Sequence, residues 1–367
     1  MNNLGKISKK TVSRCQVSMI EIDDSTEGQR IDNFLLCLCK GVPKSHIYRI
    51  LRSGEVRVNK GRVKAQYRLV RGDIVRKPPI LEKSVNLTST DTVFIPFSNF
   101  NILYEDDELL VIDKPTGIAV HGGSGIKFGV IEQIRRSCPR LKFIELVHRL
   151  DRETSGILML AKKRKALVDL HKQIREKKME KRYIACAHGE WPNSWGNRRS
   201  VNIPLLKYIT TAGERRVRVH HNGLASHTVL NLIKYWPESE KEQRTRPGTK
   251  IHEIATLHSA SSGYALIDIE LKTGRTHQIR AHLTYLGLPI AGDQKYGDFY
   301  LNKNLAHIYA KPSLKRMFLH AHYIKFLHPI TEKPIQINAP LPTECKSFLE
   351  ELNAIKTPAS SWKKYII

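Results

Sequence analysis

The densest group of reactive side chains in the sequence is the segment 148–156, which reads HRLDRETSG between two apolar, strand-like runs. Loops carried on a rigid scaffold are common places for catalytic residues. Asp151 lies between Arg149 and Arg152. Two neighbouring arginines would keep the carboxylate ionised and available as a nucleophile or as a base. A loop of surface ion pairs is the alternative that these residue types leave equally open.

A second group of polar side chains spans 273–282 and reads TGRTHQIRAH. It starts close to a glycine and continues into a segment that we expect to be helical. Arg275, Arg280 and the free N–H groups at the start of that helix could pair with Asp151 or with a phosphate. A helix cap with solvated arginines is the alternative interpretation.

A third segment joins a proline-containing turn, DKPTG at 113–117, to a glycine-rich loop, HGGSG at 121–125. The proline restricts the backbone of the turn, and the glycines make the loop flexible. The order G-x-x-x-x-G-K-[ST] of a nucleotide-binding P-loop is absent, so Lys114 is not expected to act as a P-loop lysine.

These segments need a scaffold, and the pattern of apolar residues indicates many short strands. An amphipathic helix is predicted over 162–178, where Leu167, Leu170 and Ile174 share one face. Strands linked mostly by hairpins, with few helices, indicate an α+β fold built on a mixed, mainly antiparallel β-sheet with flanking helices. A polar loop insertion is expected at 236–250. The strand-like runs are 101–104, 109–112, 146–147, 157–160, 183–187, 217–219, 229–233, 264–271 and 318–327.

The charge of the chain indicates a polyanionic partner. The 367 residues include 61 Lys and Arg against 35 Asp and Glu, a net charge of +26, with a sequence pI near 9.9. Such an excess suits nucleic acid or an anionic membrane surface. No stretch approaches the roughly 20 apolar residues of a membrane-spanning helix, and the basic N-terminus lacks the apolar core of a secretory signal. Nucleic acid is therefore the favoured partner, and no membrane is expected.

The cysteines argue against a metal or redox motif. Six are scattered along the chain without a C-x-x-C pair, which is typical of buried thiols in a reducing cytoplasm. No metal site is predicted.

The first 85 residues hold a large share of the charge, with 18 Lys and Arg against 8 Asp and Glu. A helix is predicted near 29–40, and a second, short helix is predicted to begin at Ser45 as N-cap and to end at Gly54. His46, Arg49 and Arg52 then share its solvent-facing side. A small hairpin is predicted after this helix. Apolar and polar residues alternate at 55–58, a turn is expected at 59–61, and a second ribbon is expected from Val63 to Val75. A solvated basic face without a partner is the alternative.

Residues 31–76 resemble the S4 RNA-binding domain, through RIDNFL, SHIYRILRSGEVRVNKGRVK and the closing GD. The resemblance implies that the polyanion is RNA, with Arg49, Arg52, Arg57 and Lys60 as contacts.

The three polar segments described first resemble the RluA-type pseudouridine synthases in their order and spacing. These segments are HRLDRETSG, TGRTHQIRAH and the lysine-proline turn, and the likeness extends from about 31 to 341. The sequence departs from the family pattern in two places. Glu153 stands where many members have Asp, and the 236–250 insertion looks longer than usual.

The resemblance implies one catalytic carboxylate, Asp151, which could attack C1′ or C6 of the uridine or take the 2′ proton to give a glycal. It also implies Arg280 as the fixed cation partner and Tyr183, in the KRY segment, as the tyrosine that stacks on the uracil. A core aromatic is the alternative for Tyr183. Because isomerisation needs no redox step and no group donor, no cofactor is implied. The residues implied to contact RNA or hold the site loops are Arg149, which fills the position vacated by the flipped base, and Lys114, Arg152, Arg275 and His277.

The chain resembles most the members that modify large-subunit ribosomal RNA, which implies 23S rRNA or an assembly intermediate as the partner of a cytoplasmic monomer. Other rRNA or tRNA uridines, or a non-catalytic S4-type assembly protein, are alternatives. The expected organisation is a basic extension at 1–28, an S4-like domain at 29–77, a linker at 78–99, the catalytic domain at 100–345 and a tail at 346–367.

A zinc deaminase is the rival enzyme, because His188-Gly189-Glu190 matches half of its signature. The P-C-x-x-C half is missing, and His277 and His282 have the wrong spacing for a helical zinc pair.

Overall fold

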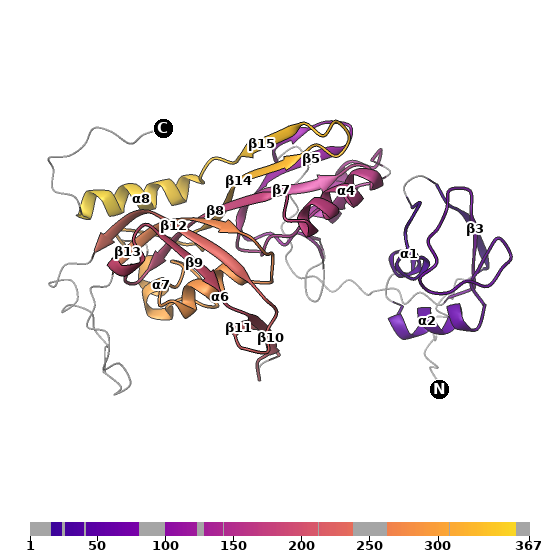
Figure 1. Ribbon diagram of the computed structural model, residues 1–367, viewed down its shortest axis with the longest axis horizontal. Helices are drawn as coiled ribbons and strands as arrows, with labels where there is room; N and C mark the ends of the chain where they lie inside the picture. The colour runs from indigo at the N-terminus through magenta and orange to yellow at the C-terminus, as the bar shows by residue number, and fades with distance from the viewer. Residues whose placement is uncertain are drawn as a thin grey trace, which may run out of the picture. The chain divides into compact units, whose positions relative to one another are not determined.

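The computed structural model describes residues 16–23, 26–39, 42–80, 100–122, 128–141, 143–211, 213–237, 263–307 and 309–356. Contacts within the chain divide it into two compact units, Met1–Asp91 and Thr92–Ile367 (Figure 1). The expected linker at 78–99 lies outside the described residues from 81 on.

The first unit is a small helical and β domain with its own core. Its buried side chains include Ile31 and Leu35 from α1, Ile47 and Ile50 from α2 and Val75 from β3. The strand order is β1-β3-β2, with both pairs antiparallel. The elements are β1 (Ser18–Glu21), α1 (Ile31–Leu38), α2 (Lys44–Arg52), β2 (Arg57–Val58) and β3 (Ile74–Lys77).

Three sequence predictions for this unit need correction. The second helix is capped by Pro43 and begins at Lys44, so Ser45 lies within its first turn. The second ribbon starts only at Ile74, because 63–73 forms turns and bridges. Strand β1 falls inside the expected 1–28 extension but pairs with β3, so that part of the extension belongs to the domain.

The second unit is built on one large mixed sheet and confirms the predicted α+β class. The strand order is β4-β5-β7-β14-β8-β13-β12-β9, with β15 paired to β14 and β6 paired to β7. All pairs are antiparallel except β7 with β14. A separate hairpin is formed by β10 (Leu205–Ile209) and β11 (Arg215–Val219). The sheet strands are β4 (Asn101–Glu105), β5 (Leu109–Lys114), β6 (Glu145–Leu146), β7 (Ser155–Ala161), β8 (Glu180–His188), β9 (Arg198–Asn202), β12 (His227–Pro237), β13 (Gly263–Leu271), β14 (Leu319–Leu327) and β15 (Pro334–Asn338).

Strands β5 and β7 are covered on both faces. Their alternate side chains enter two cores, one shared with helix α3 (Val130–Ser137) and one with α4 (Arg164–Arg175). Every residue of β7 is buried, which explains its unbroken apolar run. The amphipathic helix predicted at 162–178 is α4, and its buried residues include Leu170.

The remaining described α-helices pack around the other half of the sheet. They are α6 (Gln278–Tyr285), α7 (Phe299–Leu305) and α8 (Thr343–Lys356), and Figure 1 shows α8 lying along β12 and β13. Cys345, Phe348 and Leu352 of α8 are buried in the main core, so the expected boundary at 345 cuts through a helix, and a tail beginning at 346 is wrong. Trp236 and Pro237 belong to β12, and the rest of the expected 236–250 insertion lies outside the described residues.

Gly156 has a specific role where β7 meets β14. It pairs with Ala321, and its φ is +106°, a conformation that favours glycine. A Cβ at this position would lie 2.2 Å from the carbonyl oxygen of Ala321. Glycine is therefore needed here for the parallel pairing that holds the loop before β7 in place.

No helix among the described residues is both long and apolar enough to cross a membrane.

Candidate active site

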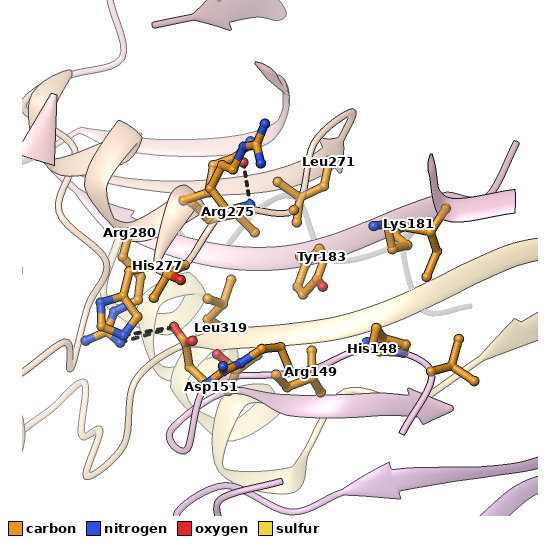
Figure 2. Close-up of a pocket in the computed structure, with 18 of the residues that line it drawn as sticks. His148, Arg149, Asp151, Lys181, Tyr183, Leu271, Arg275, His277, Arg280 and Leu319 are labelled. Carbon is orange, nitrogen blue, oxygen red and sulfur yellow. Dashed lines mark hydrogen bonds and ion pairs between the residues drawn. The ribbon is translucent and has the colours of Figure 1, made fainter. Parts of the chain in front are cut away.

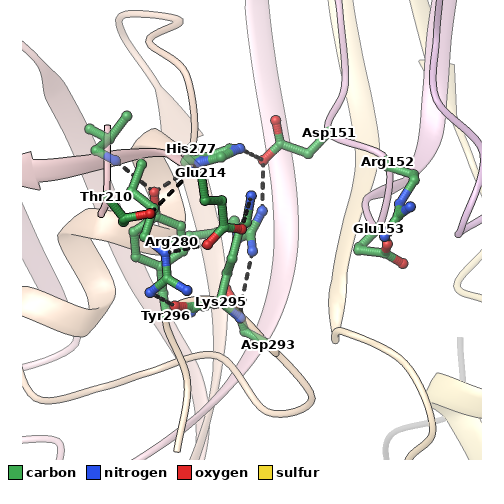
Figure 3. Close-up of polar contacts among 12 residues, drawn as sticks. Asp151, Arg152, Glu153, Thr210, Glu214, His277, Arg280, Asp293, Lys295 and Tyr296 are labelled. Atoms are coloured by element: carbon green, nitrogen blue, oxygen red, sulfur yellow. Dashed lines mark hydrogen bonds and ion pairs between the residues drawn. The ribbon is translucent and has the colours of Figure 1, made fainter. Parts of the chain in front are cut away.

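Asp151 and Arg280 meet where the loop before β7 approaches α6. Oδ2 of Asp151 lies 3.3 Å from Nη1 of Arg280, although 129 positions separate the two residues in the sequence (Figure 3). The Arg280 side chain is only 5% exposed, whereas that of Asp151 is 21% exposed. The carboxylate is thus reachable, and its cation partner is fixed in the protein.

Asp293 holds the guanidinium of Arg280 from the other side. Nε and Nη2 of Arg280 donate to the two Asp293 oxygens at 2.7 Å each. Asp293 Oδ1 also accepts from the backbone N–H groups of Lys295 and Tyr296. The 292–296 turn, which carries Asp293, packs closely against the backbone just before β14. A Cβ on Gly292 would lie only 1.9 Å from the carbonyl oxygen of Arg316. A bidentate pair of this kind fixes the orientation of an arginine.

His277 is the third group at Asp151. Its Nε2 lies 3.8 Å from Asp151 Oδ2, and its Nδ1 lies 2.8 Å from the Tyr296 hydroxyl. The Val217 N–H donates to that hydroxyl, which can in turn donate its proton to Nδ1 and leave the Nε2 proton facing Asp151. Burial lowers the pKa of His277, and the Arg280 and Lys295 charges add to this against the opposing effect of Asp151.

Tyr296 connects the β10–β11 hairpin to the site. Its ring packs 5.0 Å from the Arg280 guanidinium, and burial raises its pKa to about 12. Glu214, at the hairpin, binds both Arg216 and Lys295, and hydrogen bonds from these two lower its pKa to about 2. The hairpin is therefore fastened to the 293–296 turn.

A cavity of about 360 Å³ opens beside Asp151 (Figure 2). Tyr183 of β8 and Leu319 of β14 form part of its wall, next to the carboxylate. No hydrogen bond to the Tyr183 hydroxyl occurs in the part of the chain that the structure describes. Burial, and secondarily the charge of Asp151, raise the pKa of Tyr183 well above its usual value of 10. The phenol therefore remains protonated near neutral pH.

Asp151 also borders a second, larger cavity of about 690 Å³. Arg149 lines both cavities and is exposed, and no hydrogen bond or ion pair of its side chain occurs among the described residues. Arg152 lines only the second cavity, where its exposed side chain pairs with Glu153 at 2.7 Å. The flanking arginines of the motif thus do not pair with Asp151, and Arg149 is available for a ligand.

Lys114 lies inside the protein, away from solvent. Its side chain is fully buried, and Nζ donates to the carbonyl oxygens of Pro115, Ile118 and Arg152 at 2.7, 2.9 and 3.1 Å. Burial lowers its pKa to about 7. Of the two roles expected for Lys114, the structure favours holding the site loops, because three carbonyls occupy its three donor protons.

Two histidines anchor the start of the Asp151 loop. His148 Nε2 accepts from the Met159 N–H, and His171 of α4 lies 3.1 Å from the Val147 carbonyl. Burial, and then the Lys181 charge, lower the pKa of His148 to about 3, so it stays neutral. Arg275 is exposed at the cavity wall, where its Nε donates to Ala225 O.

The predicted contacts of the S4-like domain are all exposed. Arg49 forms an ion pair with Glu55 at 3.3 Å, and Arg57 donates to the carbonyls of Gly54 and Lys60. Arg52 has no hydrogen bond or ion pair within the described residues. The structure therefore leaves Arg52 and the Lys60 ammonium accessible to a ligand.

Sequence reasoning missed three residues of the site, Asp293, Tyr296 and Lys181. Asp293 carried a usable signal, since an acidic residue after the apolar run LGLPIAG must find a cation if it is buried. Tyr296 and Lys181 carried none, because their roles depend on segments distant in sequence.

The zinc deaminase alternative gains nothing from the structure. Within the described ranges no group of three or more His, Cys, Asp or Glu residues could hold a metal ion. His282 is buried and bonded to Thr228 and to the Ile203 carbonyl.

Family comparisons agree with both units. Residues 108–285 match the model described as RNA pseudouridylate synthase, and residues 29–75 match the S4 domain model. The S4 resemblance inferred from the sequence is thereby confirmed. A solved human structure, RNA Pseudouridylate Synthase Domain Containing 4, aligns over 69% of this chain and 93% of its own, with a TM-score of 0.49 and 23% identity.

Curated relatives resemble the whole chain. Ribosomal large subunit pseudouridine synthase C of Pasteurella multocida (strain Pm70) is 47% identical over 354 residues, which cover 96% of this chain and 98% of that protein. The protein of the same name from Escherichia coli (strain K12) is 46% identical over 338 residues, covering 92% of this chain and 97% of its own. The chain therefore belongs to the RNA pseudouridylate synthase family, whose members isomerise uridine to pseudouridine in RNA.

Proposed function

We propose that this pseudouridine synthase acts on uridines of large-subunit (23S) ribosomal RNA, with Asp151 as its catalytic residue. The reaction breaks the N1–C1′ bond, turns the uracil while it stays bound, and joins C5 to C1′. N1 gains a proton and C5 loses one, so atoms balance without a group donor or a redox partner.

The contact between Asp151 and Arg280 carries the assignment. A carboxylate that faces a cavity and has a buried, fully oriented guanidinium 3.3 Å away can act on a substrate without reorganising its surroundings. The same position serves attack at C1′, attack at C6 or removal of the 2′ proton. A non-catalytic RNA-binding protein has no use for an acidic group in this position, because it repels phosphate.

Tyr183 is proposed to stack on the uracil and to serve the proton transfer at C5. It lines the cavity beside Asp151, and its raised pKa keeps the phenol protonated in the resting enzyme. The phenol oxygen can therefore take up the proton that leaves C5 only as its own proton passes on to another acceptor, such as N1 or water. A tyrosine with a satisfied hydroxyl would suit a purely structural role better.

Arg149 is proposed to fill the place of the flipped base. An enzyme that acts on a base in a helix must bring it out of the stack. Arg149 lies two residues before Asp151, borders both cavities and is exposed. Its planar guanidinium can stack between bases.

The substrate assignment draws on three observations. The chain carries a net charge of +26, the N-terminal unit matches the S4 domain, and curated relatives at 46–47% identity are named for the ribosomal large subunit. We expect the enzyme to act in the cytoplasm as a monomer, on 23S rRNA or an assembly intermediate.

Mapping of pseudouridine by carbodiimide treatment tests this proposal. Ribosomal RNA from cells lacking the gene should lose modification at discrete 23S uridines, and the wild-type gene should restore it. The variant D151N should not restore it, whereas D107N, at an exposed aspartate in the β4–β5 turn, should. Loss of pseudouridine only from small-subunit rRNA or tRNA would contradict the substrate assignment, and full restoration by D151N would contradict the catalytic one.

A further inference from the structure

Lys181 is a half-buried lysine for which the described part of the chain offers no counterion. It lies on β8, and its ammonium lines the cavity beside Asp151, as Figure 2 shows. No hydrogen bond or ion pair of its side chain occurs within the described ranges. Burial lowers its pKa. Removing an unpaired ammonium from water costs desolvation free energy. An anion bound from outside the protein would offset that free energy.

The cavity walls carry far more positive than negative charge. Its described lining includes the cations Arg149, Arg175, Lys181, Arg275 and Arg280 and one acidic residue, Asp151. Arg280 already pairs with that carboxylate and with Asp293. Among the described lining residues, Lys181 therefore has no acidic partner left over.

The backbone before α6 borders the Lys181 ammonium. A Cβ added to Gly274 would lie 3.8 Å from Lys181 Nζ, so the backbone before α6 borders the ammonium without filling the site. Arg175 of α4 adds a second cation to the same cavity. His148, also on the wall, remains neutral near pH 7 and does not compete for the anion.

The spacing along β8 relates this end of the cavity to the base. Lys181 and Tyr183 are two residues apart in a strand, so their side chains share one face, about 7 Å apart along the strand. If the uracil stacks on Tyr183, the Lys181 ammonium is at the distance of a neighbouring backbone group of the same nucleotide.

We propose that Lys181 and the cationic wall around it form a phosphate subsite, which binds the RNA backbone phosphate next to the flipped uridine. The proposal rests on the function proposed above. It gives Lys181 a role in placing the nucleotide and leaves the bond chemistry to Asp151.

The test uses the full-length protein and a synthetic stem–loop that contains a mapped target uridine. In two further RNAs, a neutral methylphosphonate replaces each phosphate flanking that uridine in turn. Binding and pseudouridine formation are measured for wild type, K181Q, K181R and K325Q. Lys325 is the matched control, because it is exposed on the neighbouring strand β14.

K181Q should weaken binding of the unmodified RNA about tenfold, the scale of one charged hydrogen bond. One of the two methylphosphonates should weaken wild-type binding to a similar extent and cause no further loss in K181Q. K181R should keep most of the affinity, and K325Q should behave as wild type. K181Q should also unfold at the same or a higher temperature than wild type, because an unpaired buried charge is removed.

Wild-type RNA affinity in K181Q would overturn the proposal. So would a loss of affinity in K181Q that adds fully to the loss caused by each of the two methylphosphonates. A K181Q protein that is destabilised and shows no effect specific to one phosphate would also overturn it. Full additivity would mean that Lys181 contacts another group, such as a uracil carbonyl. Failure of the wild-type protein to form pseudouridine in the unmodified stem–loop would instead contradict the proposed function.

Discussion

Arg280 and Asp293 form a buried bidentate ion pair, in which two guanidinium nitrogens donate to the two carboxylate oxygens at 2.7 Å each. The Asp293 side chain is fully buried, and the Arg280 side chain is 5% exposed. The pairing leaves Nη1 of Arg280 directed at Asp151. Asp293 therefore positions the cation on which the carboxylate depends, although it does not contact Asp151.

The first prediction concerns this positioning. In D293N, an amide group faces the guanidinium, and one of the two charge-assisted bonds is lost. A misplacement of about 1 Å can cost on the order of 100-fold in rate, so kcat should fall between about 10- and 100-fold with little change in KM. Single-turnover kinetics on the mapped stem–loop measure the effect.

The control is D298N, in the same segment. Asp298 caps α7 through the Leu301 N–H, and asparagine caps equally well. D298N should keep wild-type kcat. A D293N enzyme that is folded and retains wild-type kcat would show that Arg280 does not need Asp293.

The second prediction concerns His277 and acid pH. Its pKa is lowered from 6.5, so the imidazole is neutral at pH 7 and gains a proton only as the pH falls below 6.5. The imidazolium would then compete with Arg280 for Asp151. Activity should therefore decline on the acid side below pH 6.5, and this decline should be smaller in H277Q.

Measurement of kcat between pH 5 and 9 tests the His277 prediction. H307Q, at an exposed histidine, should keep the wild-type profile. An acid limb that is unchanged in H277Q would assign the decline to another group.

The third prediction is a dependence of stability on pH through His320. This histidine is fully buried, Ser155 Oγ lies 2.9 Å from its Nδ1, and burial lowers its pKa to about 4. Between pH 6.5 and 4 the unfolded chain binds more protons than the folded one. The contribution of neutral His320 to the free energy of unfolding is thus complete above pH 6.5. It is lost as the pH falls towards 4, by up to about 1.4 kcal/mol per pH unit.

Urea unfolding followed by tryptophan fluorescence can detect the His320 effect, because Trp191 and Trp236 lie in the core of the same unit. The free energy of unfolding of H320Q should depend less on pH in this range than that of wild type. Equal pH slopes for the two proteins would contradict the assignment.

The fourth prediction concerns the S4-like domain as an RNA anchor. Each phosphate contact releases counterions, so the slope of log K against log salt should become shallower by about 1 for each contact removed. R52Q and K60Q should each show this change in binding to a 23S rRNA fragment. K163Q is the control, because Lys163 pairs with Glu108. Unaltered slopes for R52Q and K60Q would place the anchor elsewhere.

Local patterns predicted most strands of the large sheet and the helix at 162–178, because these depend on apolar periodicity within each segment, but they missed β9, β10 and β15. The family motifs singled out Asp151, Arg280 and Tyr183, and the structure places all three around one cavity. Lys114 was expected at the substrate or at the site loops, and only the fold shows three carbonyls enclosing its ammonium. Asp293 and Tyr296 act through partners brought together by tertiary structure, which no local pattern encodes.

The central claim is that Asp151 performs the chemistry while the rest of the molecule binds and places the RNA. The direct measurement is pseudouridine formation and RNA affinity for purified wild-type and D151N proteins on the same 23S rRNA fragment. We expect D151N to form no detectable product and to bind the RNA within about threefold of wild type, a difference below about 0.7 kcal/mol. Pseudouridine formation by D151N at the wild-type rate would contradict the account.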